Sequence, residues 1–492
     1  MLARRLPCSP RSQRAWIPRA TTGASAATDP SAQRQQHVDE EGNQISRNIS
    51  NFEPSIWGDF FLTYSSPLAS PTQQEMIERA EHLKERVSKT ISASSSNCSL
   101  YERMELIDAL ERVCLDHLFK EEINVLLTEI NDADISGCDL QTVALWFFLL
   151  SKHGYQVSPD VFSNFRDEQG SFAANNPMDL LSLYNAACLR PNGEIILDEA
   201  VSFTKRCLES ILDNIEGPFA REVKCALEIP ASRRVRIYEA KYYVSGHGEG
   251  YEVIMELAKL NFNIIQLQHQ QELKIITRWW KGLELQSRLS FARDRVVECY
   301  FWVVGVYYEP SYSRGRIILT KIIDLVRAYN KEVKWREEGY VPATIEEHLH
   351  VSARSGACHL LSCTSFIGMR DIATEEAFDW VSNVPKLVKA LCIILRLSDD
   401  LKSYEREKMT CHVASTIDSC MKEHGVTVEV AREKIHDMIE ETWKDFNEEW
   451  LNINNRMPKE LLERIFNLTR TMVFMYNQDD AYTNSVMSSR TP

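Results

Sequence analysis

The chain lacks the features that mark membrane, nucleic-acid-binding and secreted proteins. Its longest apolar runs, such as residues 143–150, are far too short to cross a bilayer. Its formal net charge of −14 leaves no basic surplus, which a nucleic-acid-binding protein needs to displace counterions from phosphates. The 13 cysteines follow no secretory signal, and their odd number and irregular spacing indicate reduced thiols. We therefore expect neither a membrane nor a nucleic-acid partner.

Strand signals are also missing, and glycine (18) and proline (17) are scarce in the 492 residues. No alternating pattern or βαβ rhythm persists along the chain. Stretches such as 73–91 and 140–155 instead repeat apolar residues at i, i+3, i+4 and i+7, which predicts amphipathic helices. Glycine and proline gather between such stretches, as at 153–159 and 190–194. We predict an all-α protein whose helical pattern is interrupted at 229–250.

The first 28 residues contain no Asp or Glu but hold five arginines among many Ser, Ala and Thr. This composition is typical of a plastid or mitochondrial transit peptide. A disordered leader without a targeting role has the same composition, so both interpretations stay open.

Residues 397–408, "LSDDLKSYEREK", place Asp399, Ser403 and Glu407 at i, i+4 and i+8. On a helix this spacing stacks three oxygen ligands along one face. Such a row suits Mg²⁺, which prefers hard oxygen ligands and usually shares them with a substrate phosphate. A solvated acidic helix face is the simpler alternative. One row seldom encloses a metal-bound diphosphate, so the metal hypothesis also requires an opposing set of carboxylates.

A second candidate metal site is much weaker. Cys358, His359 and Cys363 are close in sequence, but their spacing does not match a zinc motif and no second cluster follows. We expect these residues to belong to the hydrophobic core.

Several long motifs resemble those of plant terpene synthases, and the resemblance covers about residues 45–485. The row at 399–407 matches the second metal motif of that family, D-D-x-x-S-x-x-x-E. The other matching stretches are "RNISNFEPSIWGDFF" (47–61), "LLSKHGYQVSPDVFSNFRDEQGSF" (149–172), "LLSLYNAACLRPNGEIILDEA" (180–200), "ELKIITRWWKGLELQSRLSFARDRVVECYFW" (272–302) and "MYNQDDAYTNS" (475–485).

The resemblance implies two helical domains, an N-terminal α-barrel-like domain and a C-terminal class I terpenoid synthase bundle. We place the boundaries at 45–245 and 246–492, after an extension over 1–44. The implied reaction cleaves a prenyl diphosphate with Mg²⁺, or with Mn²⁺, and cyclises the resulting carbocation. A metal and arginines stabilise the departing diphosphate, and aromatic faces attract the cation.

The family pattern assigns roles to individual residues of this chain. Asp399, Ser403 and Glu407 bind the metal. Arg293 and Arg295 match an R-x-R pair that receives the diphosphate, although a surface ion pair with Asp294 or Glu298 is the simpler interpretation. The remaining implied residues are Arg396, which assists the diphosphate, Trp302, which faces the cation, and Asp480 and Tyr482, which line or cap the pocket.

The first metal motif of the family, D-D-x-x-D, does not occur in this sequence. Adjacent aspartates stand only at 399–400 and 479–480, and neither pair has an Asp three residues further on. The motif should follow residues 312–323, but the chain continues directly into 324–342, which in the family begins a much later helix. About five helices of usual length are therefore absent. We predict an internal deletion near 323/324, an incomplete C-terminal bundle, and one continuous helix across the join.

Two functional hypotheses follow from these motifs. The first is a Mg²⁺-dependent synthase that acts as a monomer on farnesyl diphosphate, with geranyl diphosphate as the alternative. Arg47 matches only the first residue of the tandem arginine of many monoterpene synthases, and Asn48 in the second place favours the sesquiterpene branch. The transit-like leader favours geranyl diphosphate in plastids, so plastid and cytoplasm both stay open. The second hypothesis is a catalytically inactive relative or a splice variant.

Overall fold

The computed structural model describes residues 59–63, 71–174, 176–237, 239–240, 243, 251–282, 313–409, 412–452 and 455–480. Within these residues the chain forms α-helices, short 3-10 turns and an isolated antiparallel bridge between Arg166 and Phe172. The all-α prediction is confirmed. None of the helices found among these residues is long and apolar enough to cross a membrane.

The first half of the described chain contains a series of amphipathic helices joined by tight turns. Gly154 and Gly193 have positive φ angles of 81°, as expected for the turns at 153–159 and 190–194. The helices are α1 (Phe60–Thr63), α2 (Pro71–Asn97), α3 (Leu100–Arg112), α4 (Lys120–Asn131), α5 (Leu140–Lys152), α6 (Pro177–Ala187), α7 (Ile195–Ile211), α8 (Gly217–Glu228) and α10 (Glu252–Gly282), with 3-10 turns η2 (Asp116–Leu118), η3 (Pro159–Phe165), η4 (Leu212–Asn214) and η5 (Ala231–Arg233).

The second half contains the helices that carry the candidate site. They are α13 (Ser313–Glu337), α14 (Ile345–Ser355), α15 (Cys358–Ile367), α16 (Glu375–Ser382), α17 (Lys386–Lys408), α18 (Thr416–His424), α19 (Val428–Trp450) and α20 (Lys459–Met475), with the 3-10 turn η6 (Arg370–Ile372).

The two halves bury separate hydrophobic cores. Two clusters of buried side chains draw only on residues before 261, and two others only on residues after 316. Polar contacts join the halves: Arg233 pairs with Glu440 of α19 at 2.5 Å, and Arg470 of α20 donates a hydrogen bond to the carbonyl of Ser232 at 2.8 Å. The described residues thus contain two packed cores with a polar junction.

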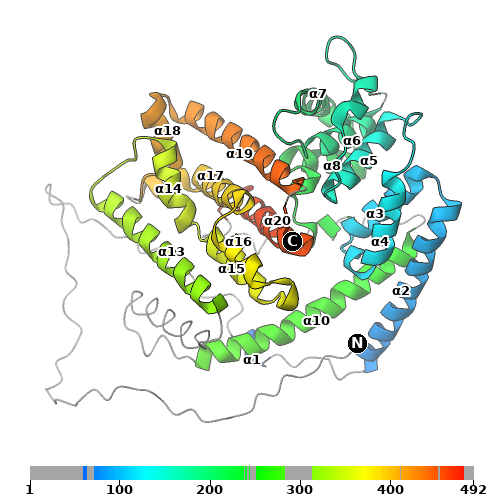
Figure 1. Ribbon diagram of the computed structural model, residues 1–492, viewed down its shortest axis with the longest axis horizontal. Helices are drawn as coiled ribbons and strands as arrows, with labels where there is room; N and C mark the ends of the chain where they lie inside the picture. The colour runs from blue at the N-terminus through cyan, green and yellow to red at the C-terminus, as the bar shows by residue number, and fades with distance from the viewer. Residues whose placement is uncertain are drawn as a thin grey trace. The chain divides into compact units, whose positions relative to one another are not determined.

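Helix α17 is the central element of the second half. It packs against α14, α15, α18, α19 and α20, and its N-terminal part buries apolar residues such as Leu391 and Ile394. Helix α13 is a single uninterrupted helix of 25 residues (Figure 1), so the continuous helix predicted across residues 323 and 324 is confirmed.

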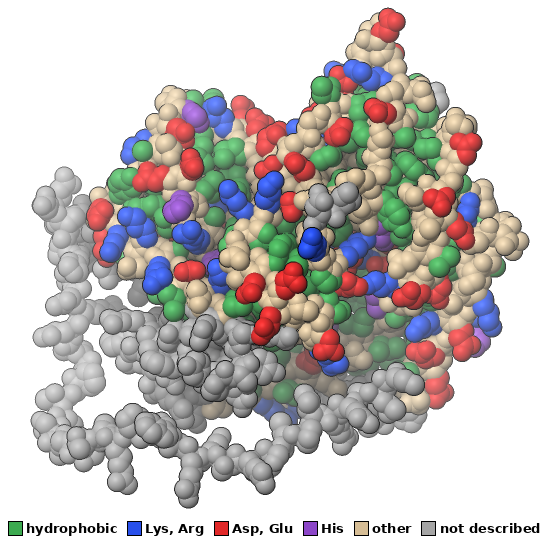
Figure 2. All heavy atoms as spheres, viewed as in Figure 1, with side chains coloured by type: hydrophobic (Ala, Val, Ile, Leu, Met, Phe, Trp, Pro, Cys, Tyr) green, Lys and Arg blue, Asp and Glu red, His purple; other side chains and the backbone are tan. Residues whose placement is uncertain are grey.

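Charged side chains of both signs are interspersed over the described part of the face drawn in Figure 2. A negative ligand that binds near this surface would therefore depend on local cations and not on a broad positive field.

Candidate functional site

The predicted metal row lies on the C-terminal half of α17. Asp399, Ser403 and Glu407 are all helical, so their side chains share one face of the helix. Ser403 is buried, and the Asp399 and Glu407 side chains are 15% and 19% exposed. The interpretation of this segment as a solvated acidic face therefore does not fit.

The row concentrates negative charge in a poorly hydrated place. Burial raises the pKa of the Asp399 carboxyl to about 7, and the charges of Asp400, Glu407 and Asp480 add to this rise although Arg396 opposes it. Burial also raises the pKa of Glu407. A divalent cation at this position would favour the ionised form of both carboxylates.

The donors present fit a hard divalent cation. The Ser403 hydroxyl is buried and lies close enough to Glu407 to lower the pKa of that carboxyl, and its oxygen lone pairs are available to a cation. Two carboxylates and one hydroxyl at successive turns are the oxygen ligands that Mg²⁺ accepts. Asp399, Ser403 and Glu407 would hold the cation, which when bound would neutralise charge on phosphate oxygens.

Asp400, the neighbour of Asp399, has a structural position. One carboxylate oxygen accepts hydrogen bonds from the backbone N–H and the hydroxyl of Thr416, at 2.6 and 2.5 Å. Nε2 of His348 lies 3.5 Å from this same oxygen, and the other oxygen pairs with Arg396 at 3.1 Å. Although burial opposes ionisation, these partners hold the pKa of Asp400 below its usual range. Asp400 thereby ties α17 to the first turn of α18.

Arg396 lies between the two aspartates. Its guanidinium is 3.2 Å from Asp399 and 3.1 Å from Asp400. Its charge also acts on Glu332 of α13, a half-buried carboxylate that accepts a hydrogen bond from Ser355 at 2.5 Å. The structure therefore places Arg396 beside the metal row, with its charge engaged by carboxylates.

Asp480 lies at the C-terminal end of the same row. It is 2% exposed, and its carboxylate pairs with Arg406 of α17 at 2.6 Å. The same Arg406 guanidinium lies 3.9 Å from the Glu407 carboxylate, so Arg406 links Asp480 to the end of the row. The structure thus brings Asp480 together with the metal row. Arg293, Arg295, Trp302 and Tyr482 lie outside the described residues.

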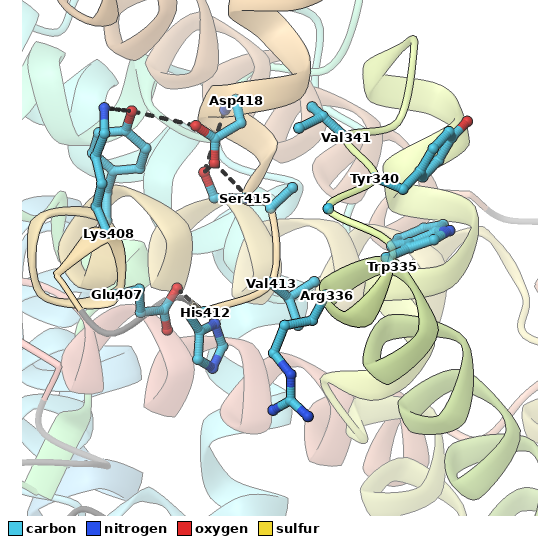
Figure 3. A pocket seen from close by; sticks show the side chains of 13 residues that line it. Trp335, Arg336, Tyr340, Val341, Glu407, Lys408, His412, Val413, Ser415 and Asp418 are labelled. Atoms are coloured by element: carbon cyan, nitrogen blue, oxygen red, sulfur yellow. Dashed lines mark hydrogen bonds and ion pairs between the residues drawn. The ribbon is translucent and has the colours of Figure 1, made fainter. Parts of the chain in front are cut away.

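A cavity of about 240 Å³ opens beside Glu407, between the ends of α13 and α17 and the start of α18. On one side Lys408 donates to the Tyr404 hydroxyl at 2.9 Å, and on another Nδ1 of His412 lies 3.4 Å from Glu407 (Figure 3). The lining residues are Trp335, Arg336, Gly339, Tyr340, Val341, Tyr404, Glu407, Lys408, His412, Val413, Ala414, Ser415 and Asp418.

Sequence reasoning missed Glu332, Arg336, Arg406 and His412 as members of this neighbourhood. The sequence contained two weak signals for this neighbourhood. Glu332 and Arg336 are four residues apart, and Arg406 directly precedes Glu407.

The described residues contain no second cluster of metal ligands. No group of three or more His, Cys, Asp or Glu side chains among them is arranged to hold a metal ion. Cys358, His359 and Cys363 are buried, at 0%, 3% and 0% exposed, which confirms that they belong to the core. The ten described cysteines are all free thiols.

Two family models match the chain: the terpene synthase N-terminal domain at residues 56–227, and the terpene synthase family metal-binding domain at 281–326 and 322–445. The chain belongs to the terpene synthase family. The metal-binding domain of the family includes the whole row on α17. The family prediction made from the sequence motifs is therefore confirmed.

Curated relatives lie in the same family. The chain is 60% identical to the chloroplastic alpha-terpineol synthase of Zea mays, over 90% of this chain and 84% of that one. It is 40% identical to the beta-sesquiphellandrene synthase of Sorghum bicolor, over 91% and 95%. Among solved structures, a limonene synthase with 2-fluorolinalyl diphosphate matches with a TM-score of 0.78 at 24% identity, over 89% of this chain and 98% of that one. The two-domain all-α fold is shared.

Isoprene synthase from grey poplar leaves, solved in complex with three Mg²⁺ ions and dimethylallyl-S-thiolodiphosphate, matches with a TM-score of 0.73 at 25% identity, over 84% of this chain and 95% of that one. The family metal-binding domain in this chain and the metal complex of this neighbour together support the use of a divalent cation.

Proposed function

We propose that the chain binds the diphosphate group of a prenyl diphosphate through a divalent cation held by Asp399, Ser403 and Glu407. The reaction is that of the family, in which the carbon–oxygen bond to the diphosphate breaks and the carbocation is converted to a terpene. Arg293 and Arg295 remain the predicted acceptors of the diphosphate, and Trp302, Asp480 and Tyr482 the predicted lining of the carbocation pocket.

One observation carries this proposal: the oxygen ligands of Asp399, Ser403 and Glu407 lie on one poorly exposed face of α17. Burial, together with the charges of nearby carboxylates, raises the pKa of both the Asp399 and the Glu407 carboxyl. A bound cation would stabilise the ionised form of both carboxylates. Mg²⁺ suits the donor set, and Mn²⁺ accepts the same ligands.

For the substrate we propose geranyl diphosphate ahead of farnesyl diphosphate. The motif at Arg47 and Asn48 favoured the longer substrate. The relative at 60% identity is, however, named for alpha-terpineol, a C₁₀ product, whereas the sesquiterpene synthases match at 40% identity or less. Higher identity over a similar share of the chain supports the shorter substrate. The term chloroplastic in that name, together with the acid-free leader, also supports a plastid location.

Slow or absent turnover is the second candidate, and the missing D-D-x-x-D motif favours it. The match to the metal-binding domain falls into two parts, 281–326 and 322–445, that meet at the proposed deletion. The alignment with the maize relative spans 528 residues, more than the 492 of this chain, although it covers only 90% of it. The relative therefore holds tens of residues without a counterpart here, which supports a deletion.

The experiment that tests the proposal incubates the full chain with Mg²⁺ and either geranyl or farnesyl diphosphate, and measures released inorganic diphosphate and volatile terpenes. The control is Glu407→Gln, which keeps the side-chain volume and removes the charge. We expect release above the control from geranyl diphosphate, at a rate at least about a thousandfold below a typical turnover of ~10 s⁻¹. Equal release of diphosphate from the unmodified chain and from Glu407→Gln would contradict a role for the metal row. Turnover at a typical enzymatic rate would contradict the claim that half of the site is missing.

A further inference from the structure

The cavity beside Glu407 has cationic groups that the metal row does not account for. Three elements meet there: the end of α13, the end of α17 and the segment that leads into α18. In Figure 3, Glu407 of α17 and Arg336 of α13 lie on different sides of the cavity with His412 between them, and the side chains of His412 and Arg336 extend in the same direction. Lys408 lies on the α17 side, where it donates a hydrogen bond to Tyr404.

Arg336 differs from the other arginines near this site. Arg396 pairs with Asp399 and Asp400, and Arg406 pairs with Asp480. The guanidinium of Arg336 is exposed, lines the cavity and has no hydrogen bond or ion pair within the described residues. A guanidinium without such a partner, opposite a predicted metal-binding carboxylate, is available to bind an anion.

The charge of a diphosphate favours more than one cationic partner. A prenyl diphosphate carries more negative charge than one divalent cation neutralises, and the described residues offer a single metal row. Its phosphate oxygens would extend from a cation on Glu407 into the adjoining cavity. The charge of Arg396 is already opposed by its two aspartates, so a further cation would add to the compensation expected from Arg293 and Arg295.

We propose that Arg336 binds the diphosphate oxygens from across this cavity, as an anion-binding residue of the site. The inference rests on the proposed function, because it requires that Asp399, Ser403 and Glu407 hold a cation. A guanidinium donates two parallel hydrogen bonds to phosphate oxygens, which a lysine cannot reproduce. The ring of His412 lines the same cavity as Arg336 and Glu407.

A simpler role for Arg336 is that of a cation in the last turn of a helix, where it complements the helix dipole. Lys334 stands in the same last turn of α13, is exposed and does not line the cavity. It is therefore a matched control, because its loss removes the same charge from the same helix end.

The test measures binding of inorganic diphosphate to the full chain in excess Mg²⁺ by titration calorimetry. Arg336→Gln should weaken binding about tenfold, the usual effect of losing a hydrogen bond to a charged group. Lys334→Gln should bind diphosphate with an affinity within about twofold of that of the unmodified chain. The affinity of Arg336→Lys should lie between those of Arg336→Gln and the unmodified chain. Circular dichroism and thermal unfolding verify that the variants fold, which we expect because the side chain is exposed.

Equal affinity for Arg336→Gln and the unmodified chain would overturn this assignment while leaving the metal row intact. Equal losses of diphosphate affinity in Arg336→Gln and Lys334→Gln would also overturn the assignment and would favour the helix-dipole role. If the unmodified chain binds no diphosphate, or if Glu407→Gln binds it equally well, the proposed function fails and the role of Arg336 fails with it.

Discussion

Asp399 and Asp400 are adjacent in the chain and have different surroundings. Asp399 lies on the face of Ser403 and Glu407, where burial raises its pKa to about 7. Asp400 accepts hydrogen bonds from Thr416 and forms an ion pair with Arg396. Without a bound cation, the ionised form of Asp399 destabilises the fold. Asp400 stabilises the fold through its protein partners alone.

We predict opposite outcomes for the two amide variants. Asp400→Asn should lower the free energy of unfolding by about 2–4 kcal/mol, because it removes one partner of a buried ion pair and an acceptor at the start of α18. Asp399→Asn should change it by no more than about 1 kcal/mol, since the raised pKa of Asp399 already makes its neutral form accessible at neutral pH.

The measurements are urea unfolding at pH 7 and Mg²⁺-dependent binding of inorganic diphosphate. Only Asp399→Asn should lose that binding while it keeps its stability. Because the pKa of Asp400 is depressed in the folded state, its contribution should persist at neutral pH and be lost only as the pH falls towards that depressed value. These assignments would be contradicted if Asp400→Asn had the same free energy of unfolding as the unmodified chain, or if Asp399→Asn bound diphosphate normally.

Spacing in the sequence was sufficient to predict the row at Asp399, Ser403 and Glu407, because one helix positions all three side chains. It could not predict the pairing of Arg406 with Asp480 or the position of Arg336 beside Glu407. Those neighbours come from different helices, and only tertiary packing brings them together.

Helix α13 has two apolar faces, and the structure packs one of them. Ala328 is buried, whereas Val326 and Val333 are 45% and 37% exposed. A helix that is apolar on both sides is usually covered on both. The sequence predicted this continuous helix correctly, but periodicity alone could not indicate which face lacks a neighbour among the described residues.

We predict that Val326→Lys combined with Val333→Lys leaves the free energy of unfolding within about 0.5 kcal/mol and reduces self-association. Ala328→Lys should lower it by several kcal/mol, because it places a charge in the core. Urea unfolding and light scattering of the full chain distinguish these outcomes. If the double variant were as destabilised as Ala328→Lys, both faces of α13 would have to be packed.

On the scale of the whole molecule, the two separate cores agree with the two helical domains that the motifs predicted, and the polar junction between them was not predicted. The family, the all-α fold and the continuous helix at the join are confirmed. The domain boundary near residue 245, the internal deletion and the monomeric state remain predictions. The missing D-D-x-x-D motif predicts slow turnover, but residue spacing alone does not give a rate, because the rate depends on how the helices around the proposed deletion pack.

The central claim is that the chain carries one half of a diphosphate site and lacks the other. The most direct test inserts between Ile323 and Asp324 the segment that the maize alpha-terpineol synthase has at this place, and measures terpene formed from geranyl diphosphate. We predict that the chimera exceeds both the unmodified chain and its own Glu407→Gln variant by at least about 100-fold, since stabilising the leaving group is a large part of catalysis. A folded chimera that binds Mg²⁺ and diphosphate but gains no activity would contradict the claim.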